Sequence, residues 1–235
     1  MNKTTQLKIN LIDKINKICE NNVSLHGYSN LEYAEEFIEN TYPIDIAHYP
    51  YAISIGMRIN DDITNTINIP GAEEAYLKEY LEVNNKLDDI AQEIVSLIIK
   101  EGYDAKSIPA SDISSKDKLA GELSHKLIAN LAGLGWIGKS CLLITPEYGP
   151  RLRWASILTN LPVPYCKNML KSRCGNCSLC VENCPVSAFK NRKFIKNEPR
   201  ELRYDAYKCN NHMDELEHKN RPRLCGVCVK ICPWG

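Results

Sequence analysis

Cys174-Gly-Asn-Cys177-Ser-Leu-Cys180-Val-Glu-Asn-Cys184-Pro185 is the stretch that decides the fold of the C-terminal part of this chain. Its spacing, C-x₂-C-x₂-C-x₃-C-P, is typical of bacterial ferredoxins. Three closely spaced thiolates wrap the corners of one iron–sulfur cubane, and the cysteine before proline ligates the other cluster. A structural zinc site would instead use two C-x₂-C pairs and needs neither the triplet nor the Cys-Pro. The motif therefore favours [4Fe–4S] clusters over zinc.

A second, shorter cysteine motif follows: Cys225-Gly-Val-Cys228-Val-Lys-Ile-Cys232-Pro233. It repeats the first motif without the first cysteine. Cys209, sixteen residues upstream, is the natural substitute, and Cys166 is the rival candidate. If each motif gives its last cysteine to the other cluster, the two predicted ligand sets are Cys174, Cys177, Cys180 and Cys232 for the first cluster, and Cys184, Cys209, Cys225 and Cys228 for the second.

The use of cysteine also bears on the compartment. Eight of the eleven cysteines fall within residues 174–232, while Cys19 and Cys141 lie in a predicted helix and strand and are expected to be core thiols. Residues 1–20 mix lysines with apolar residues, unlike the unbroken apolar stretch of a signal peptide. No stretch approaches the roughly 20 apolar residues of a membrane helix. We therefore expect a cytoplasmic protein without membrane contact, in which clustered cysteines indicate metal or redox chemistry.

The formal net charge of zero conceals an asymmetry between the two parts of the chain. Residues 166–235 contain 14 Lys and Arg against 7 Asp and Glu, which gives +7, and the remainder carries −7. A basic region favours contact with nucleic acid. It is also explained by the clusters themselves, because each oxidised [4Fe–4S] cluster with four thiolates carries about −2.

Apolar periodicity predicts an N-terminal part of mixed helices and strands. The strongest signal is a helix over 72–100 with one buried face, ended by Gly102. Residues 141–145 and 152–159 flank a Pro-Glu-Tyr-Gly-Pro turn and predict a β-hairpin. The other expected elements are helices over 4–20, 31–39 and 123–131, strands over 52–59 and 104–109, and a polar loop over 111–118. A linker at 161–164 places the domain boundary near 165.

A glycine-rich loop, Gly133-Leu-Gly135-Trp136-Ile-Gly138-Lys139-Ser140, matches the pattern of the nucleotide-binding phosphate loop. That loop needs a strand before it and a helix after it, so that phosphate meets the helix N-terminus. Here a predicted helix precedes and a predicted strand follows. The remaining interpretations are a tight glycine turn, or a loop that lets some cofactor approach the backbone.

Several of these segments together resemble epoxyqueuosine reductase. They are the glycine-rich loop 133–140, Leu142-Leu-Ile-Thr-Pro-Glu-Tyr-Gly149, Ile157-Leu-Thr-Asn-Leu-Pro162, the two cysteine motifs and the closing Cys232-Pro-Trp234. The resemblance is clear from about 121 to 235 and weaker from 50 to 110. It implies an α+β protein in which a nitroreductase-like α/β domain, residues 1–165, precedes a small ferredoxin-like double [4Fe–4S] domain, residues 166–235. Reductive dehalogenases share this arrangement.

The resemblance also implies cofactors and partners. Electrons from a low-potential donor of the ferredoxin or flavodoxin type would pass through two [4Fe–4S] clusters to cobalamin, with flavin as the less favoured cofactor, and reduce an epoxide on a tRNA nucleoside. Members of the family continue past Cys-Pro-Trp and have a longer N-terminal portion. The resemblance carries over Asp112 as the proton donor. His125, just before the glycine-rich loop, either donates a proton or a hydrogen bond to the cofactor or is a surface histidine on a helix. The candidate cofactor-binding residues are Gly133, Gly135, Trp136, Gly138, Lys139 and Ser140, with simple packing as the alternative for Trp136.

The sequence leaves two alternatives open for a pair of arginines and two for the function of the protein. Arg151 and Arg153 follow the turn and either hold an anionic group or form a solvated face. The favoured function is an iron–sulfur oxidoreductase, because a mere electron carrier would not need the large N-terminal domain. The alternative is an electron-transfer protein or reductive activator that serves a partner corrinoid or flavin protein.

Overall fold

The computed structural model describes residues 3–111 and 119–235, with side chains from residue 8 onward. Its centre is a four-stranded antiparallel sheet with strand order β1-β2-β6-β3. The strands are β1 Leu25–Asn30, β2 Tyr51–Arg58, β3 Ala105–Ile108 and β6 Leu152–Thr159, and a separate two-stranded sheet pairs β4 Trp136–Ile137 with β5 Leu143–Ile144.

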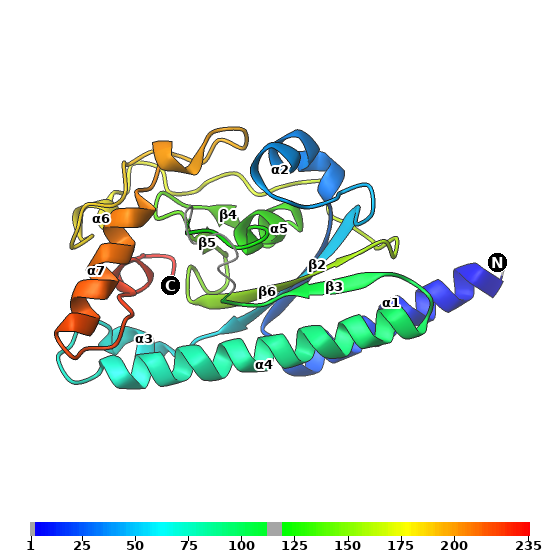
Figure 1. Ribbon diagram of the computed structural model, residues 1–235, viewed down its shortest axis with the longest axis horizontal. Helices are drawn as coiled ribbons and strands as arrows, with labels where there is room; N and C mark the ends of the chain where they lie inside the picture. The colour runs from blue at the N-terminus through cyan, green and yellow to red at the C-terminus, as the bar shows by residue number, and fades with distance from the viewer. Residues whose placement is uncertain (1–2, 112–118) are drawn as a thin grey trace.

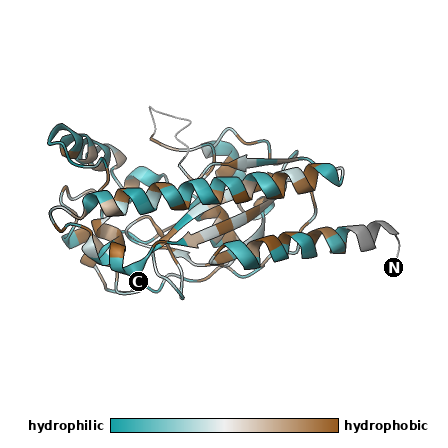
Figure 2. Cartoon of the chain, turned by 90° about the horizontal axis from the view of Figure 1, so that it is seen from below, coloured by the Kyte–Doolittle hydropathy of each residue, from teal (hydrophilic) through white to brown (hydrophobic). Residues whose placement is uncertain are grey.

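Helices cover both faces of the larger sheet (Figure 1). The long α4 (Glu73–Lys100) and α1 (Lys3–Asn22) lie on one face, and α5 (His125–Leu131) lies on the other, near the 3₁₀ helix η1 (Leu31–Ala34) and α2 (Glu35–Thr41). Figure 2 views the molecule from the α4 side, where the outer surface of that helix is mostly hydrophilic. The short α3 (Asp61–Thr66) follows β2 and packs beside α4.

The two-residue period of the strands explains how one sheet holds two cores. In β2, Ile53 and Ile55 point to the α1/α4 face, whereas Ala52 points to the α5 face. The partner strand β6 follows the same rule, with Ile157 opposite Ile53 in register and Leu158 opposite Ala52. The central strands are therefore buried on both sides, which fixes the register of the sheet.

Residues beyond β6 contain only short regular elements. They are α6 (Leu179–Glu182), η2 (Arg200–Leu202), α7 (Ala206–His218) and α8 (Val227–Lys230). All four lie at the end of the sheet away from the N-terminus, next to β4, β5 and α3 (Figure 1). With so little backbone regularity, this part depends on something other than secondary structure for its organisation. Over the described ranges 3–111 and 119–235, no helix is long and apolar enough to span a bilayer.

The mixed α+β character is as predicted, but the predicted hairpin is wrong. Strand β6 pairs with β2 and β3 on its two edges, so neither edge is open to residues 141–145. Only Leu143 and Ile144 of that segment are extended, and they pair with Trp136 and Ile137. The turn between the two segments closes on itself through a Thr145–Gly149 bridge instead of joining two strands of one sheet.

Candidate iron–sulfur centre and cavity

The first group of cysteine thiols gathers around Cys180. Burial, and after it the nearby thiols of Cys174, Cys232 and Cys177, raise the pKa of the Cys180 thiol to about 11. Cys232 in turn interacts with Cys174 and Cys177. A turn closed by the hydrogen bond from the Cys177 N–H to the Cys174 carbonyl, 2.9 Å long, brings the first two cysteines together. These are the four cysteines that the spacing predicted for one cluster.

The second group gathers around Cys228. Burial raises its pKa, followed by the thiols of Cys225, Cys209, Cys180 and Cys184. Cys209 stands in the first turn of α7, whose N-cap Asp205 accepts a hydrogen bond from the Lys208 N–H. A hydrogen bond from Tyr204 partly offsets the effect of burial on the pKa of the Cys209 thiol.

Cys166, the rival to Cys209, lies elsewhere. Its thiol donates to the Asn168 carbonyl at 3.3 Å and contacts Gly133, where an added Cβ would come within 2.8 Å of the sulfur. Helix α7 was not predicted from the sequence, although Asp205 before an Ala-Tyr-Lys run is a capping signal that could have revealed it. The geometry therefore brings together the predicted eight cysteines and leaves Cys166 apart.

Eight soft thiolates in two groups of four fit two cubane clusters. A cubane holds its thiolates at separate corners, so they stand farther apart than the ligands of one ion. In the described part of the chain, no three His, Cys, Asp or Glu side chains are close enough together to hold a single metal ion.

The glycine-rich loop packs against the cysteine loops. An added Cβ at Gly138 would lie 3.5 Å from Cys174 Sγ, and the buried Lys139 donates from Nζ to the Cys177 carbonyl at 2.9 Å. At Gly135 an added Cβ would meet the Ile144 carbonyl oxygen at 2.3 Å, so the hairpin β4–β5 requires glycine there. The loop thus approaches the region of the first cysteine group.

Trp136 is a packing residue at this contact. It is 1% exposed, and its ring meets that of Trp234 edge to face at 4.9 Å between centroids. The Arg173 guanidinium lies 5.7 Å from each of the two ring centroids. Ser140 is buried as well. These contacts join the glycine-rich loop to the residues directly after Cys232.

A large cavity of about 1180 Å³ lies between the N-terminal elements and the C-terminal loops. Residues from both parts line it, including Phe37, Tyr42, His125, Ile137, Phe194 and Arg203. Its volume exceeds the roughly 300–1,000 Å³ of ordinary ligand pockets. None of Gly133, Gly135, Trp136, Gly138, Lys139 and Ser140 is among the described residues that line it, which differs from their predicted role at such a ligand.

His125 lines this cavity at the start of α5. Its Nδ1 lies 2.9 Å from Ser156 Oγ, and its Nε2 lies 3.0 Å from the Pro109 carbonyl oxygen, so both ring nitrogens are engaged by the protein. The carbonyl can only accept, which makes Nε2 the protonated nitrogen in the neutral ring. The other predicted proton donor, Asp112, lies outside the described residues.

Four cationic side chains line the cavity, Lys126, Arg153, Arg200 and Arg203, and Lys126 lies close enough to Arg203 for the two charges to interact. Burial lowers the pKa of Lys126, while the nearby thiols of Cys141 and Cys228 raise it. Arg203 is 5% exposed; its Nη1 donates to Cys141 Sγ at 3.9 Å and its guanidinium lies 4.7 Å from the centre of the Phe194 ring. Through Lys126 and Cys141, this wall joins the cavity to the second cysteine group.

Cys141 and Cys19 are both buried, as expected for core thiols. Burial raises the pKa of Cys19 to about 12. Cys141 differs because it adopts a left-handed backbone conformation, φ 55°, and lines the cavity. A positive φ is unfavourable for a side chain with a Cβ, and such strain is concentrated at functional sites.

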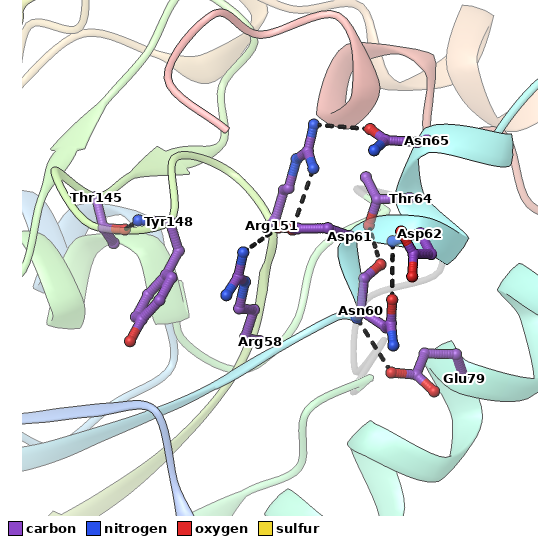
Figure 3. Close-up of polar contacts among 10 residues, drawn as sticks. All are labelled: Arg58, Asn60, Asp61, Asp62, Thr64, Asn65, Glu79, Thr145, Tyr148 and Arg151. Atoms are coloured by element: carbon purple, nitrogen blue, oxygen red, sulfur yellow. Dashed lines mark hydrogen bonds and ion pairs between the residues drawn. The ribbon is translucent and has the colours of Figure 1, made fainter.

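Arg151 and Arg153 are held by the protein rather than by solvent. Figure 3 shows the Arg151 guanidinium between Asp61 and Asn65: Nη1 lies 3.1 Å from Asp61 Oδ1, and Nη2 donates to Asn65 Oδ1 at 3.1 Å. Asp61 also pairs with Arg58. Arg153 donates to Asn84 and to the Ala110 carbonyl, each at 2.8 Å. The solvated-face interpretation of this pair is therefore wrong.

Comparison with known families and structures agrees with this geometry. Residues 173–235 match the family described as a 4Fe-4S double cluster binding domain. The C-terminal part is thus a double [4Fe–4S] module that follows a part of helices and antiparallel strands, and the class of protein defined is an iron–sulfur protein.

Curated relatives carry a more specific name. The chain is 30% identical to an epoxyqueuosine reductase of Bacillus cereus over 143 residues, and 33% identical to that of Bacillus subtilis over 137 residues. These alignments cover 57% and 52% of this chain but only 35% and 32% of the relatives' length. The resemblance to epoxyqueuosine reductases predicted from the motifs is confirmed. Because the relatives are named as reductases, the electron-carrier alternative is not favoured.

Solved structures share the fold. A catabolic reductive dehalogenase has a TM-score of 0.69 at 20% identity, over 90% of this chain and 30% of its own. An epoxyqueuosine reductase from Bacillus subtilis has a TM-score of 0.55 at 21% identity, over 98% and 65% of the two chains. At these identities the comparison concerns the fold alone.

Proposed function

We propose that this protein is an iron–sulfur oxidoreductase of the epoxyqueuosine reductase type. Residues 166–235 would carry the two [4Fe–4S] clusters, ligated as the spacing predicts, and residues 1–165 would form a nitroreductase-like domain that holds the electron acceptor. Electrons from a low-potential protein donor would enter at one cluster and leave at the other towards the cavity.

One observation carries this proposal: a residue that lines the cavity, Lys126, interacts electrostatically with a cysteine of the second group. Burial lowers the pKa of Lys126 and the Cys228 thiol raises it, while burial raises the pKa of Cys228 itself. An acceptor in the cavity would therefore lie next to the second cluster. This is the arrangement that a reductase needs and a mere electron carrier does not.

Cobalamin is the acceptor that fits this cavity best. A volume of about 1180 Å³ suits a large cofactor, and one solved structural neighbour is titled as a B12-dependent reductive dehalogenase. Cobalamin would supply a strongly reducing cobalt centre. The protein's part is to seat the ligand between α2, α5 and the C-terminal loops, exclude water and place His125 at the wall.

The proposed substrate is the epoxide-bearing nucleoside of tRNA, since the relatives are named epoxyqueuosine reductase and one solved neighbour contains an epoxyqueuosine-modified tRNA stem loop. The basic 166–235 region agrees with a polyanionic partner.

The test combines binding with turnover. Protein purified without oxygen is titrated with hydroxocobalamin and, separately, with flavin mononucleotide, and is then given reductant and an epoxyqueuosine stem loop. We expect stoichiometric cobalamin binding and conversion to queuosine, both lost in Cys228→Ser and retained in Cys19→Ala. Absence of turnover with intact clusters and bound cobalamin would contradict the proposed substrate. Failure to bind either cofactor would contradict the proposed acceptor.

A further inference from the structure

The cavity is lined by a buried arginine, Arg203, that forms no ion pair with any carboxylate in the part of the chain that the structure describes. Arg203 is 5% exposed, its Nε is buried without a hydrogen-bond acceptor, and its one side-chain hydrogen bond goes to the Cys141 sulfur at 3.9 Å. A guanidinium is charged at every relevant pH. Burying such a charge without an anionic partner is costly, and proteins rarely retain one unless a ligand completes it.

Lys126 adds a second cation to the same wall. Among the residues that the structure describes, neither Lys126 nor Arg203 forms an ion pair with a carboxylate. The neighbouring Arg200, which also lines the cavity, pairs with Glu201 and donates to the Leu119 carbonyl. Arg153 lines the cavity too, but Asn84 and the Ala110 carbonyl accept its hydrogen bonds. Within the described ranges, Lys126 and Arg203 therefore line one space without a carboxylate counter-charge.

We propose that Lys126 and Arg203 form an anion subsite of the cavity, which binds a phosphate group of the ligand held there. This rests on the proposed function in that the ligand occupies the same cavity. The Arg203 fork suits the paired oxygens of phosphate, and Lys126 adds a point charge beside it. The ring of Phe194, whose centre lies 4.7 Å from the Arg203 guanidinium carbon, packs against this fork.

The source of the phosphate is either the nucleotide portion of a cofactor or the backbone of a nucleic acid. Both present the same singly charged phosphodiester. The subsite would anchor the ligand by its charged end, and the remaining cavity, lined by aromatic residues such as Phe37 and Tyr42, would receive the rest.

The test uses radiolabelled inorganic phosphate as the probe, in equilibrium dialysis with the anaerobically purified protein that contains its clusters. We expect about one phosphate per chain, with binding weakened about tenfold or more in Arg203→Gln and in Lys126→Gln. Arg192→Gln is the matched control, because Arg192 is an exposed arginine paired with Glu198. It should bind phosphate like the unmodified protein. Iron content and circular dichroism verify that each variant folds.

Competition identifies the source of the phosphate. Displacement of the label by cobalamin but not by cobinamide, which lacks the nucleotide, indicates the cofactor phosphate; displacement by a short RNA stem loop indicates a backbone phosphate. Absence of saturable binding overturns the proposal. So does equal binding by Arg203→Gln and the unmodified protein, which would mean that the second cluster alone compensates the charge. Phosphate binding that persists without reductase turnover would contradict the proposed function and leave the subsite intact.

Discussion

Arg151 and Arg203 are two buried arginines in the region of the cysteine groups, and they differ in their hydrogen-bond and ion-pair partners. Arg151 interacts with Cys232 of the first group and finds its partners, Asp61 and Asn65, within the chain (Figure 3). Arg203 lines the cavity, and among the described residues its guanidinium has the Cys141 sulfur as a hydrogen-bond acceptor and the Phe194 ring as an aromatic contact, with no carboxylate in an ion pair. The same side chain is therefore a structural element at one cluster and a ligand-binding element at the other.

The packing around the two arginines shows the same difference. At Arg151 the chain is closed: the turn before it and the residues after Cys232 touch through backbone atoms, and Gly235 lies against the guanidinium. At Arg203 the chain is open to about 1180 Å³ of space. We infer that the second cluster faces the cavity, and that the first, whose loop residues 171–173, 175 and 176 are exposed, faces the electron donor.

The largest expected effect comes from adding a methyl group at Gly149, in the closely packed region around Arg151. Gly149→Ala places a Cβ 2.5 Å from the Trp234 backbone at a φ of +54°, so the segment that follows Cys232 must move. We expect the free energy of unfolding to fall by about 3 kcal/mol, measured by anaerobic urea denaturation. Gly71→Ala is the control, with a φ of +87° and nothing within 4 Å; its expected cost is about 1 kcal/mol. Equal costs would contradict close packing at Gly149.

Replacing each arginine by methionine tests directly whether Arg151 is paired within the protein and Arg203 is not. Arg151→Met should lower the free energy of unfolding by about 2 kcal/mol, because Asp61 and Asn65 lose their partner. Arg203→Met should leave it unchanged or raise it by up to about 1 kcal/mol, because an unpaired buried charge is lost. The measurement is urea denaturation without phosphate. Destabilisation by Arg203→Met as large as that by Arg151→Met would show that Arg203 already has a partner.

Removing the carboxylate that pairs with the buried Arg151 should lower the free energy of unfolding more than removing the carboxylate that pairs with the exposed Arg192. Asp61→Asn keeps the shape but removes the charge opposite a buried arginine, and we expect a loss of about 1–2 kcal/mol, since the Asp61 side chain is itself 40% exposed. Glu198→Gln breaks the pair with the exposed Arg192 and should cost less than about 1 kcal/mol. The ratio of the two losses, from the same denaturation curves, checks the distinction.

The smallest effect concerns redox potential. Lys139→Gln removes a buried positive charge that donates to the Cys177 carbonyl. A loss of about 0.5–1 kcal/mol of charge stabilisation would lower the potential of the first cluster by about 20–40 mV. Potentiometric titration followed by electron paramagnetic resonance resolves the two clusters. The exposed Lys167→Gln serves as control, and a shift confined to the second cluster would contradict the placement of Lys139.

The sequence predicted correctly those features that depend on residues close together in the chain. The cysteine spacings identified two ligand sets, and the structure brings the same eight thiols together because each motif fixes its own turn. The α4 helix and strands β2 and β6 followed from periodicity. Strand β1 was not predicted, because Leu25–Asn30 has no alternation of apolar and polar residues. It is extended through its pairing with β2.

The parts that depend on distant contacts could not be predicted. The 141–145 segment is strand-like in composition, yet its partner is set by which edges of β6 are already occupied. The glycine-rich loop was expected at a cofactor, and it packs against the first cysteine group and not against the cavity. The pairing of Arg151 with Asp61 joins residues 90 positions apart, and no local pattern reports it.

The central claim, two interleaved sets of four thiolates, is tested most directly by the iron content of two single variants. Protein purified without oxygen should contain roughly eight irons per chain, in two four-iron clusters. Cys209→Ala should retain about half of that iron and lose one cluster signal, whereas Cys166→Ala should retain all of it. Full iron in Cys209→Ala, or loss of a cluster in Cys166→Ala, would contradict the ligand sets.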